Sequence, residues 1–305
     1  MISFTIGDAE AGARLDHVVA AHAGCSNKEA QRLIDAGMVR VDGRAAKKGR
    51  RLERGARVEL LAGPATIEER RPVPQPELPL IVIDENSELV AVAKPPDMPT
   101  HPLRVGERGT LANAIVARYP ECATASDDPR EGGVAHRLDR DTSGVVIAAR
   151  TPAAWHRLRA AFSDGGVEKE YLALVAGDPP RQLVVDSNIA QVGRRVRVLP
   201  GSAPEGLPAQ SEIETIARGP GVALVRVLAR TGRMHQVRAH LAHVGHPIVG
   251  DELYGGPIVG SRDDDPGQLL HAARVVVSGL TFEAPLPAPR KARIEALLGA
   301  PVPGR

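Results

Sequence analysis

Residues 136–144 of the chain read HRLDRDTSG, and they run directly into the apolar stretch VVIAA at residues 145–149. An apolar run of this length, bounded by polar residues, is typical of a buried β-strand. A charged turn at the end of such a strand can hold a carboxylate close to solvent while arginines supply countercharge. Asp139 is therefore the candidate reacting group, flanked by Arg137 and Arg140.

By spacing alone, the same stretch more often forms a solvated turn whose Asp and Thr side chains cap backbone groups. Its nine residues, however, resemble the active-site signature of the RluA-type pseudouridine synthases, which isomerise uridine in structured RNA. The resemblance implies that Asp139 is the catalytic residue. It also implies that Arg137 fills the space left when the target base is flipped out of its stack, and that His136 and Thr142 lie at the substrate.

Residues 169–175, KEYLALV, predict a β-strand that carries Tyr171. A tyrosine at the beginning of a strand is usually part of the core. In the same family a tyrosine in this setting lies against the target base, so the resemblance implies that Tyr171 contacts the substrate. A helix is predicted before this strand, beginning at Pro152 with Thr151 as its N-cap.

Residues 231–247, TGRMHQVRAHLAHVGHP, predict an amphipathic helix that ends at Gly245. The expected apolar face consists of Val237, Leu241 and Val244, and the expected polar face of Gln236, His240 and His243. The segment is similar to the third signature of the same family. There, the arginine that matches Arg233 pairs with the catalytic aspartate, which implies a pair between Arg233 and Asp139.

Four histidines within residues 235–246 raise a rival hypothesis, a metal-dependent phosphodiesterase. Arg233 and Arg238 would place positive charge against a metal ion, and the helix supplies no Cys, Asp or Glu to complete the ligand set. We therefore expect no metal site. The isomerisation that the resemblance implies needs no cofactor either, because no atom is gained or lost.

The composition suits a water-soluble protein of about two domains, since 43% of the 305 residues are hydrophobic. No apolar run approaches the ~18 residues of a membrane span, and the N-terminus does not resemble a signal peptide, so we expect a cytoplasmic protein. Two cysteines far apart in sequence form neither a disulfide framework nor a metal motif. Seven aromatic residues are too few for a row of base-stacking side chains.

Positive charge is concentrated at the front of the chain, where residues 1–63 carry a net charge of +3 and residues 40–57 alone carry +6. Such a run is often only a solvated face, but clustered Lys and Arg are also expected where a protein contacts phosphates. The candidate RNA-binding residues in this region are Arg14, Lys28, Arg32, Arg40, Arg44, Lys47 and Lys48.

The first 63 residues predict two helices followed by a hairpin. Ser26 is the expected N-cap of the second helix, with Glu29 completing a capping box. The dipeptide at residues 42–43, Asp-Gly, is a strong turn signal between strands. This order and its sequence resemble the small RNA-binding module named after ribosomal protein S-four, and the match covers about sixty residues.

Five prolines between residues 64 and 79 predict a stiff linker, which we place at residues 64–76. The catalytic domain is expected at residues 77–298, beginning with a β-hairpin that leads to Lys94. The family implies an RNA contact for Lys94, although a lysine that closes a strand is an equal alternative. Asp97 stands where the family has glycine, which puts the turn geometry in doubt.

The expected fold class is α+β: a mixed, mostly antiparallel sheet with flanking helices, preceded by the small αβ module. The expected function is the conversion of uridine to pseudouridine in structured RNA by an enzyme without cofactor. The resemblance favours large-subunit ribosomal RNA and leaves transfer RNA open. We also expect a monomer without membrane association. The main alternative is a non-catalytic RNA-binding or ribosome-assembly protein.

Overall fold

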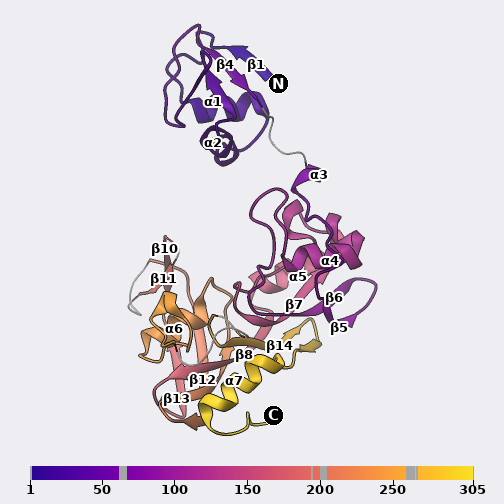
Figure 1. Cartoon of the computed structure of the whole chain (residues 1–305), viewed down its shortest axis with the longest axis vertical. Helices are drawn as coiled ribbons and strands as arrows, with labels where there is room; N and C mark the ends of the chain where they lie inside the picture. The colour runs from indigo at the N-terminus through magenta and orange to yellow at the C-terminus, as the bar shows by residue number, and fades with distance from the viewer. Residues whose placement is uncertain are drawn as a thin grey trace. The chain divides into compact units, whose positions relative to one another are not determined.

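A computed structural model describes residues 2–61, 67–193, 195–199, 205–258, 265 and 267–304. The chain forms two compact units, Met1–Glu69 and Arg70–Arg305, which are described separately (Figure 1). The boundary between them falls inside the stretch 64–76 that was expected to be a linker. Residues 64–66 of that stretch lie outside the described part, and the short helix α3 (Ile67–Arg70) follows them.

The N-terminal unit packs two helices against a four-stranded sheet with the strand order β1-β4-β2-β3. Its elements are β1 (Ile2–Thr5), α1 (Leu15–Ala23), α2 (Asn27–Asp35), β2 (Val39–Val41), β3 (Arg44–Ala45) and β4 (Arg57–Leu60). The two predicted helices and the hairpin are confirmed. Strand β1 was not predicted, because its pairing with β4 joins opposite ends of the unit.

Local signals explain where these elements begin and turn. The Ser26 hydroxyl accepts a hydrogen bond from the Glu29 backbone N–H at 3.3 Å, as expected of an N-cap. Asp42 and Gly43 both have positive φ angles, 53° and 74°, which a two-residue turn between twisted strands requires.

The C-terminal unit is built on a nine-stranded sheet with the order β5-β6-β7-β14-β8-β13-β12-β9, and β15 pairs with β14. The strands are β5 (Ile81–Glu85), β6 (Leu89–Lys94), β7 (Ser143–Ala149), β8 (Val167–Ala176), β9 (Gln182–Asp186), β12 (Gln210–Gly219), β13 (Val222–Ala229), β14 (Leu270–Val277) and β15 (Leu280–Glu283). A separate pair consists of β10 (Ile189–Val192) and β11 (Arg195–Val198). Among these described strands only β7 and β14 pair in parallel, so the expected mixed, mostly antiparallel sheet is confirmed.

Helices cover both faces of each half of this sheet (Figure 1). The helices are α4 (Leu111–Arg118), α5 (Pro152–Ser163), α6 (Gln236–His243) and α7 (Ala288–Leu298). In the β6–β7 half, Val146 packs with α4 and its neighbour Val145 packs with α5, because successive side chains point to opposite faces. In the β8–β13 half, Val175 packs with α6 and Leu174 with α7 in the same way.

The two halves meet where β7 and β14 run side by side, with Gly144 opposite Ala272. Gly144 has a φ of 122°, and a Cβ atom added there would lie 2.1 Å from the Ala272 carbonyl oxygen. No residue other than glycine fits this position.

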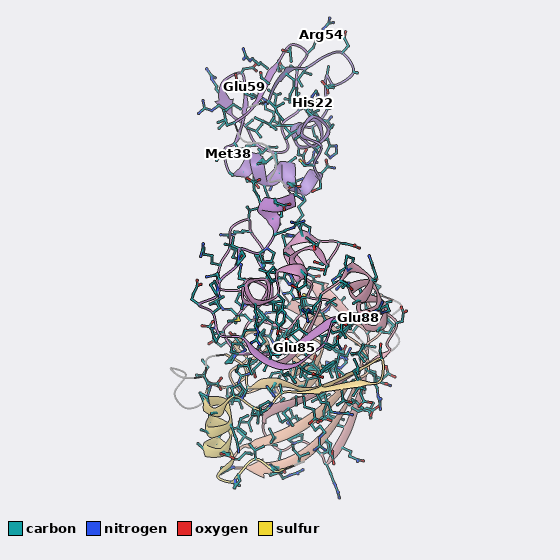
Figure 2. The ribbon with its side chains drawn as sticks, turned by 90° about the vertical axis from the view of Figure 1, so that its right-hand side faces the viewer. His22, Met38, Arg54, Glu59, Glu85 and Glu88 are labelled. Carbon is teal, nitrogen blue, oxygen red and sulfur yellow. The ribbon has the colours of Figure 1, made fainter. Side chains whose placement is uncertain are left out.

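The hairpin β5–β6 forms as predicted, with Glu85 and Glu88 at its turn (Figure 2). The Asn86 side chain holds this turn, because its Oδ1 accepts hydrogen bonds from the backbone N–H groups of Glu88 and Leu89. Thr151 caps helix α5 as predicted, with its hydroxyl 3.2 Å from the Ala154 nitrogen. Within the described residues, no helix is long and apolar enough to cross a membrane.

Candidate active site

A cleft of roughly 560 Å³ opens in the C-terminal unit, between the loop that precedes β7, strand β8 and the segment that joins β13 to α6. All six side chains that the sequence analysis assigned to catalysis or substrate binding line this one cleft. They are His136, Arg137, Asp139, Thr142, Tyr171 and Arg233.

Asp139 lies in this cleft with each carboxylate oxygen facing a different neighbour. Its Oδ2 accepts a hydrogen bond of 2.6 Å from Nη1 of Arg238. Its Oδ1 lies 3.6 Å from Nε2 of His235. The side chain is 20% exposed, so the carboxylate is held by protein groups yet open to a ligand.

Arg238 is buried and shared between two carboxylates. Its Nε and Nη2 donate to the two oxygens of Asp251, each at 2.7 Å, while Nη1 reaches Asp139. Burial acts against the charged guanidinium, but the hydrogen bond to Asp251 and the charge of Asp139 raise the pKa of Arg238. Asp251 thus fixes the guanidinium that holds Asp139.

The expected pair between Arg233 and Asp139 is therefore wrong, because Arg238 occupies the position beside the carboxylate. Arg233 lines the same cleft, but its Nε donates to the Pro208 carbonyl oxygen at 3.1 Å. Both arginines belong to the third signature, five residues apart. Arg238 lies within helix α6, whereas Arg233 lies in the loop before it.

Tyr171 lies on β8, paired across the sheet with Val227 and Ala272. Burial, together with the charge of Asp139, raises the pKa of the Tyr171 hydroxyl. The phenol therefore stays protonated in the cleft at neutral pH.

His136 forms part of the cleft wall, where its Nε2 accepts the Ile147 backbone N–H at 3.0 Å and its ring stacks on Phe162. Burial, with the nearby charge of Lys169, lowers the pKa of His136 to about 3, so the ring is neutral at physiological pH. Thr142 is also held from within, since its hydroxyl accepts from Gln268 at 3.1 Å. Arg137, by contrast, is exposed at the cleft.

The expected RNA contact of Lys94 is wrong, because its side chain is only 1% exposed. Its ammonium group donates to the carbonyl oxygens of Pro95, Met98 and Arg140 at 2.8–2.9 Å. Burial lowers the pKa of Lys94 to about 7, but three carbonyl acceptors are satisfied only by the ammonium form. Lys94 therefore ties the chain after β6 to the loop that carries Asp139.

Asp97 adopts the left-handed conformation of the glycine that the family has there, with a φ of 55°. Its carboxylate accepts a hydrogen bond of 2.7 Å from Nε of Arg140. An aspartate tolerates this conformation better than most side chains, so the turn forms without glycine.

The candidate RNA-binding residues of the N-terminal unit are exposed. Arg14 is partly used within the unit, because its guanidinium donates two hydrogen bonds to the buried Asp16. Lys48 pairs with Asp35 at 3.1 Å on the surface. The exposed cations Lys28, Arg32, Arg40, Arg44 and Lys47 complete the set.

The histidines of the third signature have separate partners. His240 is buried, with Nδ1 2.9 Å from the Ser211 hydroxyl, and His246 Nδ1 lies 3.0 Å from the Ala176 carbonyl oxygen. Among the described residues, no three His, Cys, Asp or Glu side chains are grouped to hold a metal ion. The polar face expected on α6 is only partly open to solvent, because Gln236 is also buried and hydrogen-bonds Ser211, whereas His243 is exposed.

Three residues of the site were not predicted as such: Arg238, His235 and Asp251. His235 has a φ of 54° and precedes α6, which turns its ring toward Asp139. Its Nδ1 lies 3.0 Å from the Tyr254 hydroxyl, which in turn accepts the Val196 backbone N–H. The signal for His235 and Arg238 was the signature segment itself, which contains both residues, whereas Asp251 lies four residues beyond that segment.

Sequence comparisons show the family to which this chain belongs. The family described as RNA pseudouridylate synthase matches residues 88–243, and the S4 domain matches residues 13–58. An uncharacterized RNA pseudouridine synthase of Chloroflexus aurantiacus is 37% identical over 287 residues, which cover 86% of this chain and 83% of that protein. The chain belongs to the RNA pseudouridylate synthase family, and it is an RNA pseudouridine synthase with an N-terminal S4 domain.

More specific names come from two further relatives. Ribosomal large subunit pseudouridine synthase D of Yersinia pestis is 34% identical over 257 residues, covering 84% of this chain and 77% of that protein. The protein of the same name from Nitrosomonas europaea is 31% identical over 314 residues, covering 98% of this chain and 89% of that protein.

Solved structures show the same fold. The human RNA pseudouridylate synthase domain containing 4 aligns with a TM-score of 0.58 at 20% identity, over 73% of this chain and 95% of the human chain. The human domain containing 1 aligns with a TM-score of 0.56 at 23% identity, over 77% and 90%.

Proposed function

We propose that this enzyme converts uridines of large-subunit ribosomal RNA to pseudouridine, with Asp139 as the reacting carboxylate and without a cofactor. The observation that carries the proposal is the Asp139 carboxylate in the cleft, hydrogen-bonded to Arg238 at 2.6 Å. The target class follows from the relatives named ribosomal large subunit pseudouridine synthase D.

The reaction breaks the N1–C1′ bond of uridine, turns the uracil over and joins its C5 to C1′, while the C5 proton moves to N1. One carboxylate beside the sugar can serve this chemistry by attack on C1′, by attack on C6 or by removal of the C2′ proton. Each route uses a carboxylate oxygen of Asp139, and Arg238 donates a hydrogen bond to that carboxylate. The fixed Arg238–Asp251 pair keeps it aimed into the cleft.

The remaining cleft residues have complementary roles. Arg137 is exposed at the cleft, so its planar guanidinium can stack in the gap left by the flipped uridine. Tyr171 lines the cleft as a neutral phenol against the base. His136 and Thr142 are held by protein hydrogen bonds, so they shape the wall on which the nucleotide rests.

The exposed cations of the N-terminal unit provide phosphate contacts that set affinity and register. Because the chain has few aromatic residues, recognition rests on the charge and shape of the RNA. The proposal includes a monomeric enzyme, and an enzyme of ribosomal RNA would act in the cytoplasm.

Mapping pseudouridines in ribosomal RNA from cells with and without this protein tests the target. At least one large-subunit position should lose its modification when the gene is deleted and regain it with the wild-type protein. The Asp139→Asn variant should bind the same RNA but restore no modification. Restoration by this variant would refute the role of Asp139, and an unchanged ribosomal RNA would refute the target.

A further inference from the structure

A second functional feature of the cleft lies two residues from Tyr171. Lys169 lines the cleft and is only 7% exposed. No described residue accepts a hydrogen bond from its ammonium group or forms an ion pair with it. The ammonium faces the cleft, so an anionic ligand that enters the cleft can supply the partner that the protein does not. We infer that the partner is the RNA: Lys169 and Arg233 form a phosphate subsite that binds the backbone at the target nucleotide.

The backbone geometry leaves room for this ligand at Gly232. A Cβ atom on Gly232 would lie 2.9 Å from Nζ of Lys169, and no other atom beyond the adjoining residues of the chain would be within 4 Å. The ammonium therefore lies against an exposed glycine of the cleft wall. Arg233 follows directly in the chain, so the two cations flank the same short piece of the loop.

The charged side chains that line the cleft favour a ligand that carries a full negative charge. Of the cleft-lining residues other than the Asp139–Arg238 pair, four are cations (Arg137, Arg159, Lys169 and Arg233) and one, Glu131, is an acid. Burial, followed by repulsion from Arg233, lowers the pKa of Lys169 to about 8, so the group is still mainly charged at neutral pH. A uracil carbonyl is neutral and cannot offset two adjacent cations. A phosphodiester carries the needed charge and accepts hydrogen bonds from both.

The strand also provides the correct spacing. Lys169 and Tyr171 lie two residues apart on β8, so they share one face at about 6.8 Å along the strand. This separation is comparable with the length of one nucleotide from phosphate to base. A uridine whose base meets Tyr171 would therefore bring a backbone phosphate to Lys169. This inference rests on the proposed function, because it assumes that the target nucleotide enters the cleft.

The test uses the full-length enzyme and a stem-loop RNA containing a uridine that the wild-type enzyme converts. In two further RNAs, a neutral methylphosphonate replaces the linkage on the 5′ or the 3′ side of that uridine. The variants are Lys169→Met, which removes the charge, and Gly232→Ala, which crowds Nζ. Arg230→Gln is the matched control, because Arg230 belongs to the same loop but pairs with Glu212 on the surface.

Lys169→Met should lower kcat/KM on the natural RNA by about 10- to 100-fold, as expected for one charged hydrogen bond. One of the two neutral linkages should cause a similar loss in the wild-type enzyme and no further loss in Lys169→Met. Gly232→Ala should reduce that linkage effect while the circular dichroism spectrum stays unchanged, and Arg230→Gln should behave as wild type.

The inference is overturned if each neutral linkage lowers the kcat/KM of Lys169→Met by the same factor as it lowers that of the wild-type enzyme. If Lys169→Met does not fold, the linkage effect in Gly232→Ala decides: an undiminished effect overturns the inference as well. These outcomes differ from failure of the proposed function, in which the wild-type enzyme would convert no uridine of ribosomal RNA.

Discussion

The two units of this chain use arginine and lysine in opposite ways. In the N-terminal unit, Arg40, Arg44 and Lys47 project from strands and turns into solvent, where any pairing is on the surface. In the cleft, Arg238 is buried, and its donors are divided between Asp139 and Asp251. A solvated cation keeps its mobility and attracts any phosphate, whereas a buried and doubly bonded one has a single position. The first arrangement suits affinity, and the second suits chemistry.

Removing the buried arginine should give the largest effect. Arg238→Gln leaves Asp139 without its cationic partner, so we expect kcat to fall by about 10²- to 10³-fold, as for the removal of other preorganised electrostatic groups. RNA binding, measured by filter retention, should change little. Thermal unfolding is recorded in parallel, because Asp251 also loses its partner. Unchanged kcat would break the contrast between the two units.

Exchanging Arg for Lys in both units sharpens the comparison. Arg238→Lys keeps the charge but cannot bridge two carboxylates with planar donors, so we expect a loss of kcat of about 10- to 100-fold. Arg40→Lys keeps the charge on a solvated surface, and RNA affinity should stay within about twofold. Equal effects at the two positions would contradict the view that Arg238 needs its planar geometry whereas Arg40 needs only its charge.

Neutralising the solvated cations should act on binding alone. The triple variant Arg40→Gln, Arg44→Gln and Lys47→Gln should raise KM several-fold at unchanged kcat. The slope of log affinity against log salt should become shallower by about 0.7–0.9 for each RNA phosphate that the variant no longer neutralises. Titration across a series of salt concentrations measures this slope. A lower kcat on a minimal stem-loop would indicate that the N-terminal unit also shapes the cleft.

The smallest effect concerns the ion pair inside the N-terminal unit. The hydrogen bonds from Arg14 hold the pKa of Asp16 at about 2, below its ordinary value of 3.8. The contribution of this carboxylate to stability is therefore present above about pH 4 and disappears as the pH falls from 3.8 towards 2. Asp16→Asn should cost about 1.5–3 kcal/mol near neutral pH. Amide hydrogen exchange in α1 of the full chain should show this difference shrinking below pH 3.8 and vanishing at about pH 2.

The sequence was most informative where local rules determine structure. The N-caps at Ser26 and Thr151 and the hairpin turn at Asp42 depend on residues a few positions apart, and each forms as predicted. Helix α4 was missed, although Thr110 and Asn113 form its capping box. Its buried residues are mostly alanine, leucine and valine, so no polar face gives it helical periodicity.

The site was predictable as a set of residues but not as a set of contacts. Arg233 and Arg238 are both arginines of one signature, and only the three-dimensional fold decides which reaches Asp139. Helix α6 has the predicted apolar face, but its spacing did not show that Ser211 of β12 would hydrogen-bond Gln236 and Nδ1 of His240. Lys94 was misassigned because its three carbonyl acceptors come from loops that no spacing rule connects.

The tight approach of Gly144 to Ala272 has a consequence for the Asp139–Arg238 pair. Asp139 is attached to the β6–β7 half of the sheet and Arg238 to the β8–β13 half, and this parallel pairing is the joint between them. The distance between Asp139 and Arg238 therefore depends on how the two halves of the sheet are positioned relative to each other. A side chain added at this pairing would displace Asp139 from Arg238 before it unfolded any helix. The enzyme would then lose its activity while it remained folded.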